Sequence, residues 1–162
     1  MAPAHTADPA AYEAKLDRIR ALLRARDRVL EIGCGTGIAT QALLRRYPKA
    51  NVFALDFALP MLAHARRRGR WLRRPRCICA DLDHLPLAAH SVDLVFANAA
   101  LQWSTQPGRV FADIARILRP GGLLIFSSFG PDTLHELRAA WSQVDGSPRV
   151  HDFIDMHDYG DM

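Results

Sequence analysis

Short apolar stretches alternate along the chain with stretches whose apolar residues recur at helical spacing. The first kind predicts β-strands and the second predicts amphipathic helices. The expected strands are Arg28–Ile32, Asn51–Leu55, Arg76–Ala80, Val92–Ala97 and Leu123–Ser128. The expected helices are Pro9–Arg26, Ile38–Tyr47, Pro60–Arg68, Pro107–Leu118 and Thr133–Val144. A loop is expected over Leu82–Ala89, and Arg119–Gly122 predicts a tight turn before the fifth strand.

The alternation of strands with helices predicts the fold class. The first, fourth and fifth strands are mostly apolar, as in sheets that are covered on both faces. We therefore expect an α/β fold with a doubly wound parallel sheet. Right-handed crossovers place the carboxyl ends of parallel strands on one rim. The residues expected on that rim are Gly33–Gly37, Asp56, Asp81, Asn98 and Ser128.

Composition agrees with one globular domain, because 49% of the 162 residues are hydrophobic and 23% are charged. We divide it into an N-terminal helix at 1–27, a core at 28–128 and a C-terminal helical segment at 129–162. No apolar run approaches the roughly 20 residues of a membrane helix, and residues 1–9 lack the pattern of a secretory signal. The three cysteines do not suggest a disulfide framework. They favour a reducing compartment, so we expect a cytoplasmic protein without a membrane partner.

The net charge of +4 comes mainly from the segment Arg66–Arg76. One interpretation is a solvated helix end, where cations are favoured by the helix dipole. The other is a docking patch for an acidic protein or a nucleic acid. A nucleic-acid partner is disfavoured, because the segment contains no aromatic residue besides Trp71 and the chain reads Asn98–Leu101 where an Asn-Pro-Pro-Tyr motif would stand.

Metal binding is not expected. Cys77 and Cys79 are too close in sequence for a usual zinc pair. His151 and His157 lie near three aspartates, but a polar helix start capped by Asp155 is the favoured interpretation of that stretch.

A glycine turn, Gly33-Cys34-Gly35-Thr36-Gly37, separates the first strand from the helix that follows it. Glycines are required where the backbone takes positive φ or where a ligand must approach without a Cβ in the way. Open α/β sheets bind nucleotides at such a turn. The spacing differs from the Gly-x-Gly-x-x-Gly of the dinucleotide fingerprint, so the identity of the nucleotide depends on other residues.

Three acidic residues surround this turn. Asp56 follows the second strand, where a carboxylate can accept both hydroxyls of a ribose, cap the next helix, or do both. Asp81 follows the third strand, where it can accept from the exocyclic amine of an adenine with Leu82 on the ring, or act as a cap. Glu31 precedes the turn and can pair with an ammonium group. A ligand with a ribose, an adenine and a cationic amino-acid end would use all three acids.

These motifs, with the turn Leu118-Arg119-Pro120-Gly121-Gly122, resemble the class I S-adenosylmethionine-dependent methyltransferases over Arg28–Ser128. The resemblance implies S-adenosylmethionine as cofactor, S-adenosylhomocysteine as product and no metal. It assigns cofactor binding to Glu31, Gly33, Cys34, Gly35, Gly37, Asp56, Phe57, Met61, Asp81, Leu82, Asn98 and Leu101.

A narrower resemblance rests on the runs Leu101-Gln102-Trp103, Phe126–Leu137, Ala140-Trp141 and Phe153–Asp158, with Leu59–Leu62 and Leu85–Leu87 in agreement. They are similar to the malonyl-carrier-protein methyltransferases of biotin synthesis, which methylate the free carboxyl of a malonyl thioester. The resemblance implies malonyl-acyl carrier protein as an acidic protein substrate. Such a carboxylate is already ionised at neutral pH, so catalysis requires alignment and exclusion of water rather than a general base. Tyr12, Gln102 and Trp103 are the candidates for the acceptor pocket.

The alternative is a methyltransferase-like assembly or binding protein of the complex I assembly-factor type, which binds S-adenosylmethionine without this transfer. That family shares the Thr133–Leu137 stretch. The same fold and cofactor pocket can support other chemistry, so the motifs alone do not exclude it.

Both ends of the chain differ from the narrower family. Its N-terminal segment is longer than residues 1–28, which leaves acceptor recognition open. Two further strands complete the family's sheet, and this chain ends at Met162 before them. We therefore expect the apolar edge at Leu123–Phe126 to be available for dimerisation. We also expect the cofactor pocket to survive better than methyl transfer.

Overall fold

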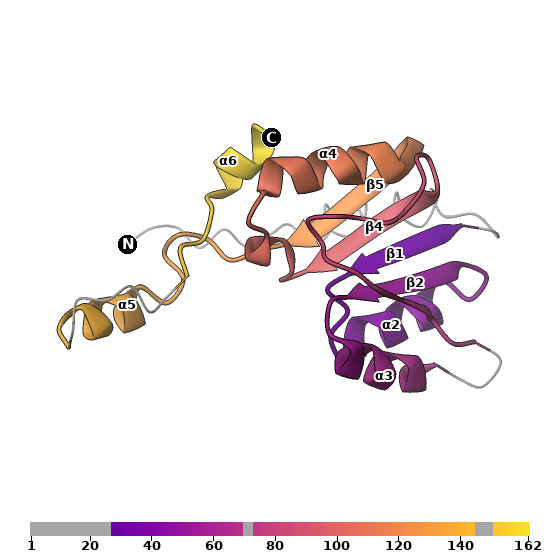
Figure 1. Cartoon of the computed structure of the whole chain (residues 1–162), viewed down its shortest axis with the longest axis horizontal. Coiled ribbons are helices and arrows are strands. Elements are labelled where there is room, and N and C mark those ends of the chain that lie inside the picture. Colours follow the sequence, from indigo (N-terminus) through magenta and orange to yellow (C-terminus); the bar gives the residue numbers. More distant parts are fainter. Residues whose placement is uncertain (1–26, 70–72, 145–150) are drawn as a thin grey trace, which may run out of the picture.

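The computed structural model describes residues 27–69, 73–144 and 151–162. The predicted helix Pro9–Arg26, with Tyr12, lies outside these residues. Within them the strands are β1 (Arg28–Ile32), β2 (Asn51–Asp56), β3 (Arg76–Cys79), β4 (Val92–Asn98) and β5 (Leu118–Ser127). The helices are α2 (Ile38–Arg46), α3 (Leu59–Arg68), α4 (Pro107–Ile117), α5 (His135–Ser142) and α6 (Met156–Gly160), with a 3-10 helix η1 (Leu101–Trp103). Figure 1 shows their arrangement.

The five strands form one parallel sheet in the order β3-β2-β1-β4-β5. The chain moves outward from β1 to β3 and then returns to the other side of β1 at β4, which confirms the predicted doubly wound sheet. Ile32 pairs with Leu55 on one side and with Ala97 on the other, so these strands end level with one another. Their carboxyl ends therefore form one rim at the point where the strand order reverses, as the sequence predicted.

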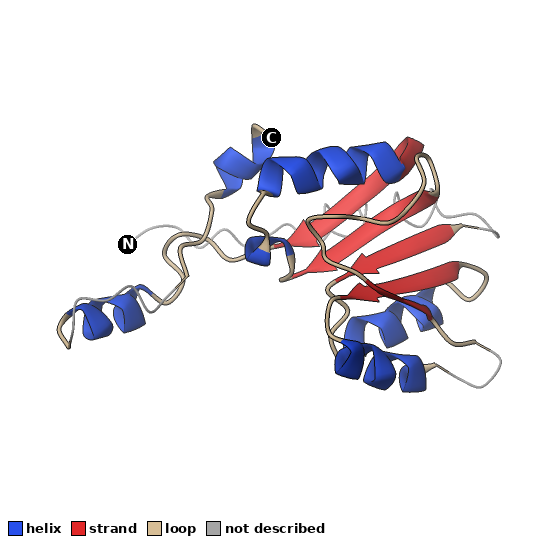
Figure 2. Ribbon diagram, viewed as in Figure 1, coloured by secondary structure: helices blue, strands red, loops and turns tan. Residues whose placement is uncertain are grey.

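Helices cover both faces of the sheet, with α2 and α3 on one side and α4 on the other (Figure 2). Side chains alternate between the faces along each strand. Val29 of β1 packs with Leu43 and Leu44 of α2, whereas Leu30 belongs to the cluster that contains Ile114 of α4. Such double coverage explains the mostly apolar composition of the central strands.

The predicted tight turn at Arg119–Gly122 is instead a bulge inside β5. Val92 pairs with Leu118 and Leu94 pairs with Leu123, so the intervening residues of β5 have no matching partners on β4. The bulge is held by Arg119, whose Nη1 donates to Asp93 Oδ1 at 2.9 Å. The strand therefore begins at Leu118 and not at Leu123, because Leu118 already pairs with Val92 of β4 before the bulge.

The C-terminal part returns to the rim. Tyr159 of α6 is buried and packs against Phe111 of α4 and Phe126 of β5, with ring centroids 5.8 Å and 5.6 Å away. The backbone N–H of His157 donates to Asp155 Oδ1 at 2.8 Å, which confirms the predicted cap. By contrast, α5 has no buried residue and lies away from the sheet (Figure 1). Among the described helices, none combines the length and the hydropathy of a membrane span.

A substitution at Gly37 tests the packing of α2 on α3. Its φ is +81°, and a Cβ would lie 2.6 Å from Ala65 Cα and 2.9 Å from Ala65 Cβ. Gly37→Ala should lower the free energy of unfolding by about 2–4 kcal/mol, from backbone strain and overpacking together. Gly108→Ala in α4, where a Cβ meets nothing within 4 Å, is the matched control and should stabilise the protein slightly. Urea denaturation checks both. Equal stability of the two variants would contradict this packing.

Candidate functional site

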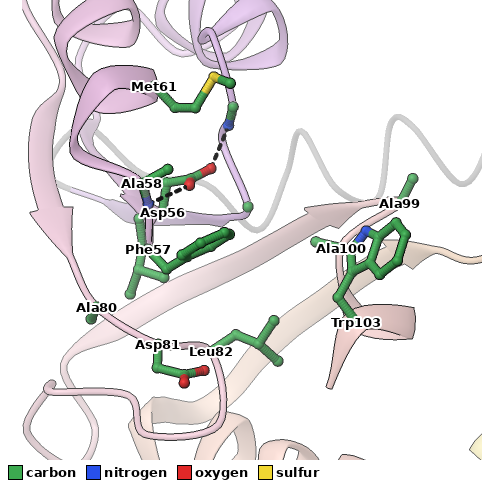
Figure 3. A pocket seen from close by; sticks show the side chains of 13 residues that line it. Asp56, Phe57, Ala58, Met61, Ala80, Asp81, Leu82, Ala99, Ala100 and Trp103 are labelled. Atoms are coloured by element: carbon green, nitrogen blue, oxygen red, sulfur yellow. Dashed lines mark hydrogen bonds between the residues drawn. The ribbon is translucent and has the colours of Figure 1, made fainter. Parts of the chain in front are cut away.

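A cavity of about 630 Å³ opens on the carboxyl rim of the sheet. It is lined by residues at the end of β2 and by residues after β1, β2, β3 and β4: Gly33, Gly35, Leu55, Asp56, Phe57, Ala58, Met61, Ala80, Asp81, Leu82, Ala99, Ala100 and Trp103. Figure 3 shows Trp103 across the cavity from Asp56 and Phe57. The cavity is mostly apolar, with carboxylates at two strand ends. That composition is typical of a site for a small organic ligand.

Asp56 connects two sides of this cavity. Its Oδ2 accepts from the N–H of Gly35 at 2.8 Å, and its Oδ1 accepts from the N–H of Ala58 at 2.9 Å (Figure 3). One carboxylate thus holds both the glycine turn and the start of α3. A carboxylate has about four acceptor positions, so each oxygen retains capacity for a ligand hydroxyl.

Two glycines of the turn have different roles. A Cβ on Gly33 would lie 2.5 Å from Ala100 Cβ, so glycine is needed for the turn to approach the corner after β4. A Cβ on Gly35 would meet no protein atom within 4 Å. Since Gly35 lines the cavity, that open space is available to a ligand.

Glu31 lies beneath the turn and does not line the cavity. It is only 2% exposed and accepts a hydrogen bond from the Thr40 hydroxyl of α2. Burial raises the pKa of Glu31 to about 7, with a further contribution from the negative charge of Asp56. The side chain is therefore partly protonated at neutral pH, and a nearby cation would favour its ionised form. The expected pairing with a ligand ammonium stays a prediction.

Cys34 is buried between the turn and α3, where it packs with Ala54, Leu62 and Ala65. Burial, and then the negative charges of Glu31 and Asp56, raise the pKa of its thiol to about 12. The thiol stays neutral at physiological pH. Its contacts are packing contacts, and a neutral thiol is a poor nucleophile.

Asp81 is exposed on the rim and accepts from the N–H of Asp83 at 2.9 Å. Asp83 itself is buried and accepts from the N–H and the hydroxyl of Thr105, at 3.1 Å and 2.7 Å. Burial raises the pKa of Asp83, but hydrogen bonds from Ser104 and Thr105 outweigh it and the net pKa is lowered. This ionised side chain ties the loop after β3 to the loop after η1.

A strained corner follows β4. Ala99 has a φ of +49°, unusual for a residue with a Cβ, and its N–H donates to Ser127 of β5. The side-chain amide of Gln102 donates to Ala99 O at 2.7 Å, and the Ser127 hydroxyl donates to Asn98 Oδ1 at 2.8 Å. Gln102 thus supports the cavity wall from behind rather than lining it. Its Oε1 has no partner among the described residues.

The structure brings together most of the predicted site residues. Those that line the cavity are Gly33, Gly35, Asp56, Phe57, Met61, Asp81, Leu82 and Trp103. Those that do not are Glu31, Cys34, Gly37, Asn98, Leu101 and Gln102. Sequence reasoning missed five lining residues, each adjacent in sequence to a predicted site residue: Leu55, Ala58, Ala80, Ala99 and Ala100. His151, which the sequence analysis assigned to a polar helix start, has its ring 5.6 Å from that of Trp103.

Part of the arginine-rich segment reaches the glycine turn. Arg68, at the end of α3, donates from its Nε to the carbonyl oxygen of Thr36 at 3.2 Å. A second cavity of about 440 Å³ between α2 and the end of α3 is lined by Gln41, Leu44, Arg45, Arg68, Gly69 and Arg73. In the part of the chain that the structure describes, no three His, Cys, Asp or Glu side chains are grouped to hold a metal ion.

Comparison with known proteins agrees with this geometry. A family model described as a methyltransferase domain matches residues 30–126, which span β1 to β5 and every strand end around the cavity. The chain therefore belongs to the methyltransferase domain family.

Individual relatives of the chain carry a more specific name than the family. The chain is 54% identical over 134 residues to a malonyl-[acyl-carrier protein] O-methyltransferase of Halorhodospira halophila, covering 83% of this chain and 45% of the relative. It is 47% identical over 155 residues to the protein of that name from Laribacter hongkongensis, covering 91% and 51%. The chain thus spans about half the length of these relatives. A solved S-adenosylmethionine dependent methyltransferase from Mesorhizobium loti matches with a TM-score of 0.61 and 32% identity, over 73% of this chain and 55% of that one.

The raised pKa of Glu31 predicts a pH-dependent effect of Glu31→Gln. Because the folded state binds this proton more tightly than the unfolded state, ionisation costs stability as the pH rises from 4.5 to 7. The amide has no such cost. The variant should gain less than about 1 kcal/mol over wild type at pH 5 and about 3 kcal/mol at pH 8.

Denaturation at the two pH values checks this prediction. Glu136→Gln on the exposed α5 is the control and should change stability little at either pH. A Glu31→Gln effect of equal size at pH 5 and pH 8 would show that the carboxylate ionises normally in the folded protein.

Proposed function

We propose that this chain binds S-adenosylmethionine in the rim cavity and is a methyltransferase whose acceptor is the free carboxyl of a malonyl thioester on an acyl carrier protein, a reaction of biotin synthesis. The observation that carries the proposal is the meeting, at one cavity, of an open glycine turn with the carboxylates of Asp56 and Asp81. Two comparisons support the proposal. The chain belongs to the methyltransferase domain family, and the relatives described above are named for this reaction.

The residues fit the parts of this cofactor. The spare acceptor positions of Asp56 suit the two ribose hydroxyls, and Asp81 with Leu82 suits an adenine amine and ring face. The open side of Gly35 suits the methionine end, with Glu31 beneath it to compensate the ammonium. When bound, S-adenosylmethionine supplies an electrophilic methyl group on a sulfonium.

The acceptor side requires little from the protein's acids and bases. A malonyl carboxylate is ionised at neutral pH, so no residue needs to remove a proton from it. The strained corner at Ala99 and the side chain of Trp103 border the cavity on this side. Their contribution would be to align the carboxylate oxygen with the methyl group and to exclude water. The neutral thiol of Cys34 does not compete for the methyl group.

Titration calorimetry with S-adenosylmethionine tests the cofactor half. Wild type should bind, and Asp81→Ala should bind at least about tenfold more weakly, because it loses a charged acceptor for the adenine amine. Asp132→Ala, an exposed aspartate in the loop before α5, is the control and should bind like wild type. If folded wild-type protein releases no heat and shows no thermal shift with the cofactor, the proposed cofactor binding is wrong.

A transfer assay with isotope-labelled methyl groups tests the acceptor half, with malonyl-carrier protein and bulk RNA offered side by side. We expect label on the carrier alone, as an alkali-labile methyl ester. Label on neither, from protein that binds the cofactor, would instead favour an assembly or binding role. Label on RNA would contradict the proposed acceptor.

Two further expectations accompany the proposal. The three cysteines are free, which suits the cytoplasm.

The edge of β5 has no neighbouring strand among the described residues, so a second copy could pair with it. Hydrogen exchange should then slow at residues 123–127 as protein concentration rises. Concentration-independent exchange, with a monomeric mass by light scattering, would exclude this dimer.

A further inference from the structure

Four rings form a continuous row that starts at the cavity. Trp103 lines the cavity, and its ring centroid lies 5.6 Å from that of His151. The His151 ring lies 5.5 Å from Phe153, and Phe153 lies 5.3 Å from Phe129. We name Trp103, His151, Phe153 and Phe129 the aromatic row. It joins three separate parts of the chain: η1, the loop after β5 and the segment before α6.

A hydrogen bond to the backbone holds the aromatic row in place. His151 Nε2 lies 2.8 Å from the backbone carbonyl oxygen of Gln102. Since a carbonyl can only accept, Nε2 carries the proton and donates it. The side chain of Gln102 in turn holds Ala99, so the position of His151 is coupled to the strained corner of the cavity. Beyond the row, Tyr159 anchors the same segment between α4 and β5.

The row is open to solvent. Trp103 is 62% exposed and Phe129 is 43% exposed, while His151 is exposed and Phe153 half-buried. Contiguous exposed rings that lead out of a cavity are more informative than scattered apolar residues, because such patches are usually contact surfaces. Flat rings offer favourable contacts to amide planes and methylene groups.

We propose that the aromatic row receives the acceptor's arm: an extended, neutral chain of amide and methylene groups whose terminal thioester enters the cavity beside Trp103. This inference rests on the proposed function, since it takes the acceptor to be a thioester on a carrier. The row is continuous with the rim cavity through Trp103, so a chain that lies along the row ends at the strand ends where the cofactor is proposed to bind. His151 acts as a positioning residue, which continues the surface from Trp103 and holds it in place.

Kinetics with malonyl-pantetheine, which has the arm but no carrier protein, test the row directly. His151→Ala removes a ring and should raise the KM for this acceptor about fivefold. His151→Phe keeps a ring and should stay within about twofold of wild type. Neither should change the Kd for S-adenosylmethionine. His135→Ala on α5 is the matched control. An unchanged KM in His151→Ala, or an equal weakening of cofactor binding, would overturn the proposal.

A second measurement separates failure of the row from failure of the proposed function. In Trp71→Phe/Trp141→Phe protein, Trp103 is the one remaining tryptophan. Its fluorescence should change saturably with pantetheine, with or without the malonyl group. A response without methyl transfer would reject the malonyl acceptor but keep the row as an arm site. Transfer without a response would reject the row. A dimer whose assembly alone alters Trp103 emission would assign the row to a second copy and also overturn the proposal.

Discussion

The cavity depends on the carboxylate of Asp56. Its two oxygens accept N–H groups from Gly35 and Ala58, so one side chain fixes the turn after β1 and the start of the helix after β2. Hydrogen bonds to an ionised acceptor are stronger than neutral ones, and both lie where strand ends leave backbone N–H groups without ladder partners. The turn is also tied to the other end of α3, where Arg68 Nε donates to the carbonyl oxygen of Thr36 at 3.2 Å. The same carboxylate also faces the ligand space.

The proposed site divides into a cofactor half and an acceptor half, which are built by different parts of the chain. The cofactor half is built by the loops after β1, β2 and β3, which are close in sequence and packed on α2 and α3. The acceptor half is built by the corner after β4 and by the C-terminal segment that returns over it. The first half needs one arrangement for one cofactor. The second can vary with the acceptor, which is why a shared fold supports many methyl acceptors.

Sequence patterns predicted the fold, and they also marked several residues that line the rim cavity, because both rest on local signals. Arg28–Ile32 has the predicted bounds of β1, and Asp56 falls where the strand must end. The burial of Glu31 could not be predicted, because it depends on how Thr40 packs against it from α2. The sequence of the β5 bulge predicts a turn, because Pro120 and Gly121 favour turns and bulges alike. Only the pairing with β4 distinguishes a bulge from a turn. His151 meets Gln102 from 49 positions away, a contact that no periodicity encodes.

A crystal structure of the protein with S-adenosylhomocysteine would show whether the rim cavity holds the cofactor. We expect ribose hydroxyls within hydrogen-bond distance of Asp56, the adenine beside Leu82 with its amine near Asp81, and the methionine end over Gly35. The sulfur should then face the corner at Ala99 and the ring of Trp103. A ligand bound outside the rim cavity, or one inside it with the ribose away from Asp56, would rule out the proposed cofactor site.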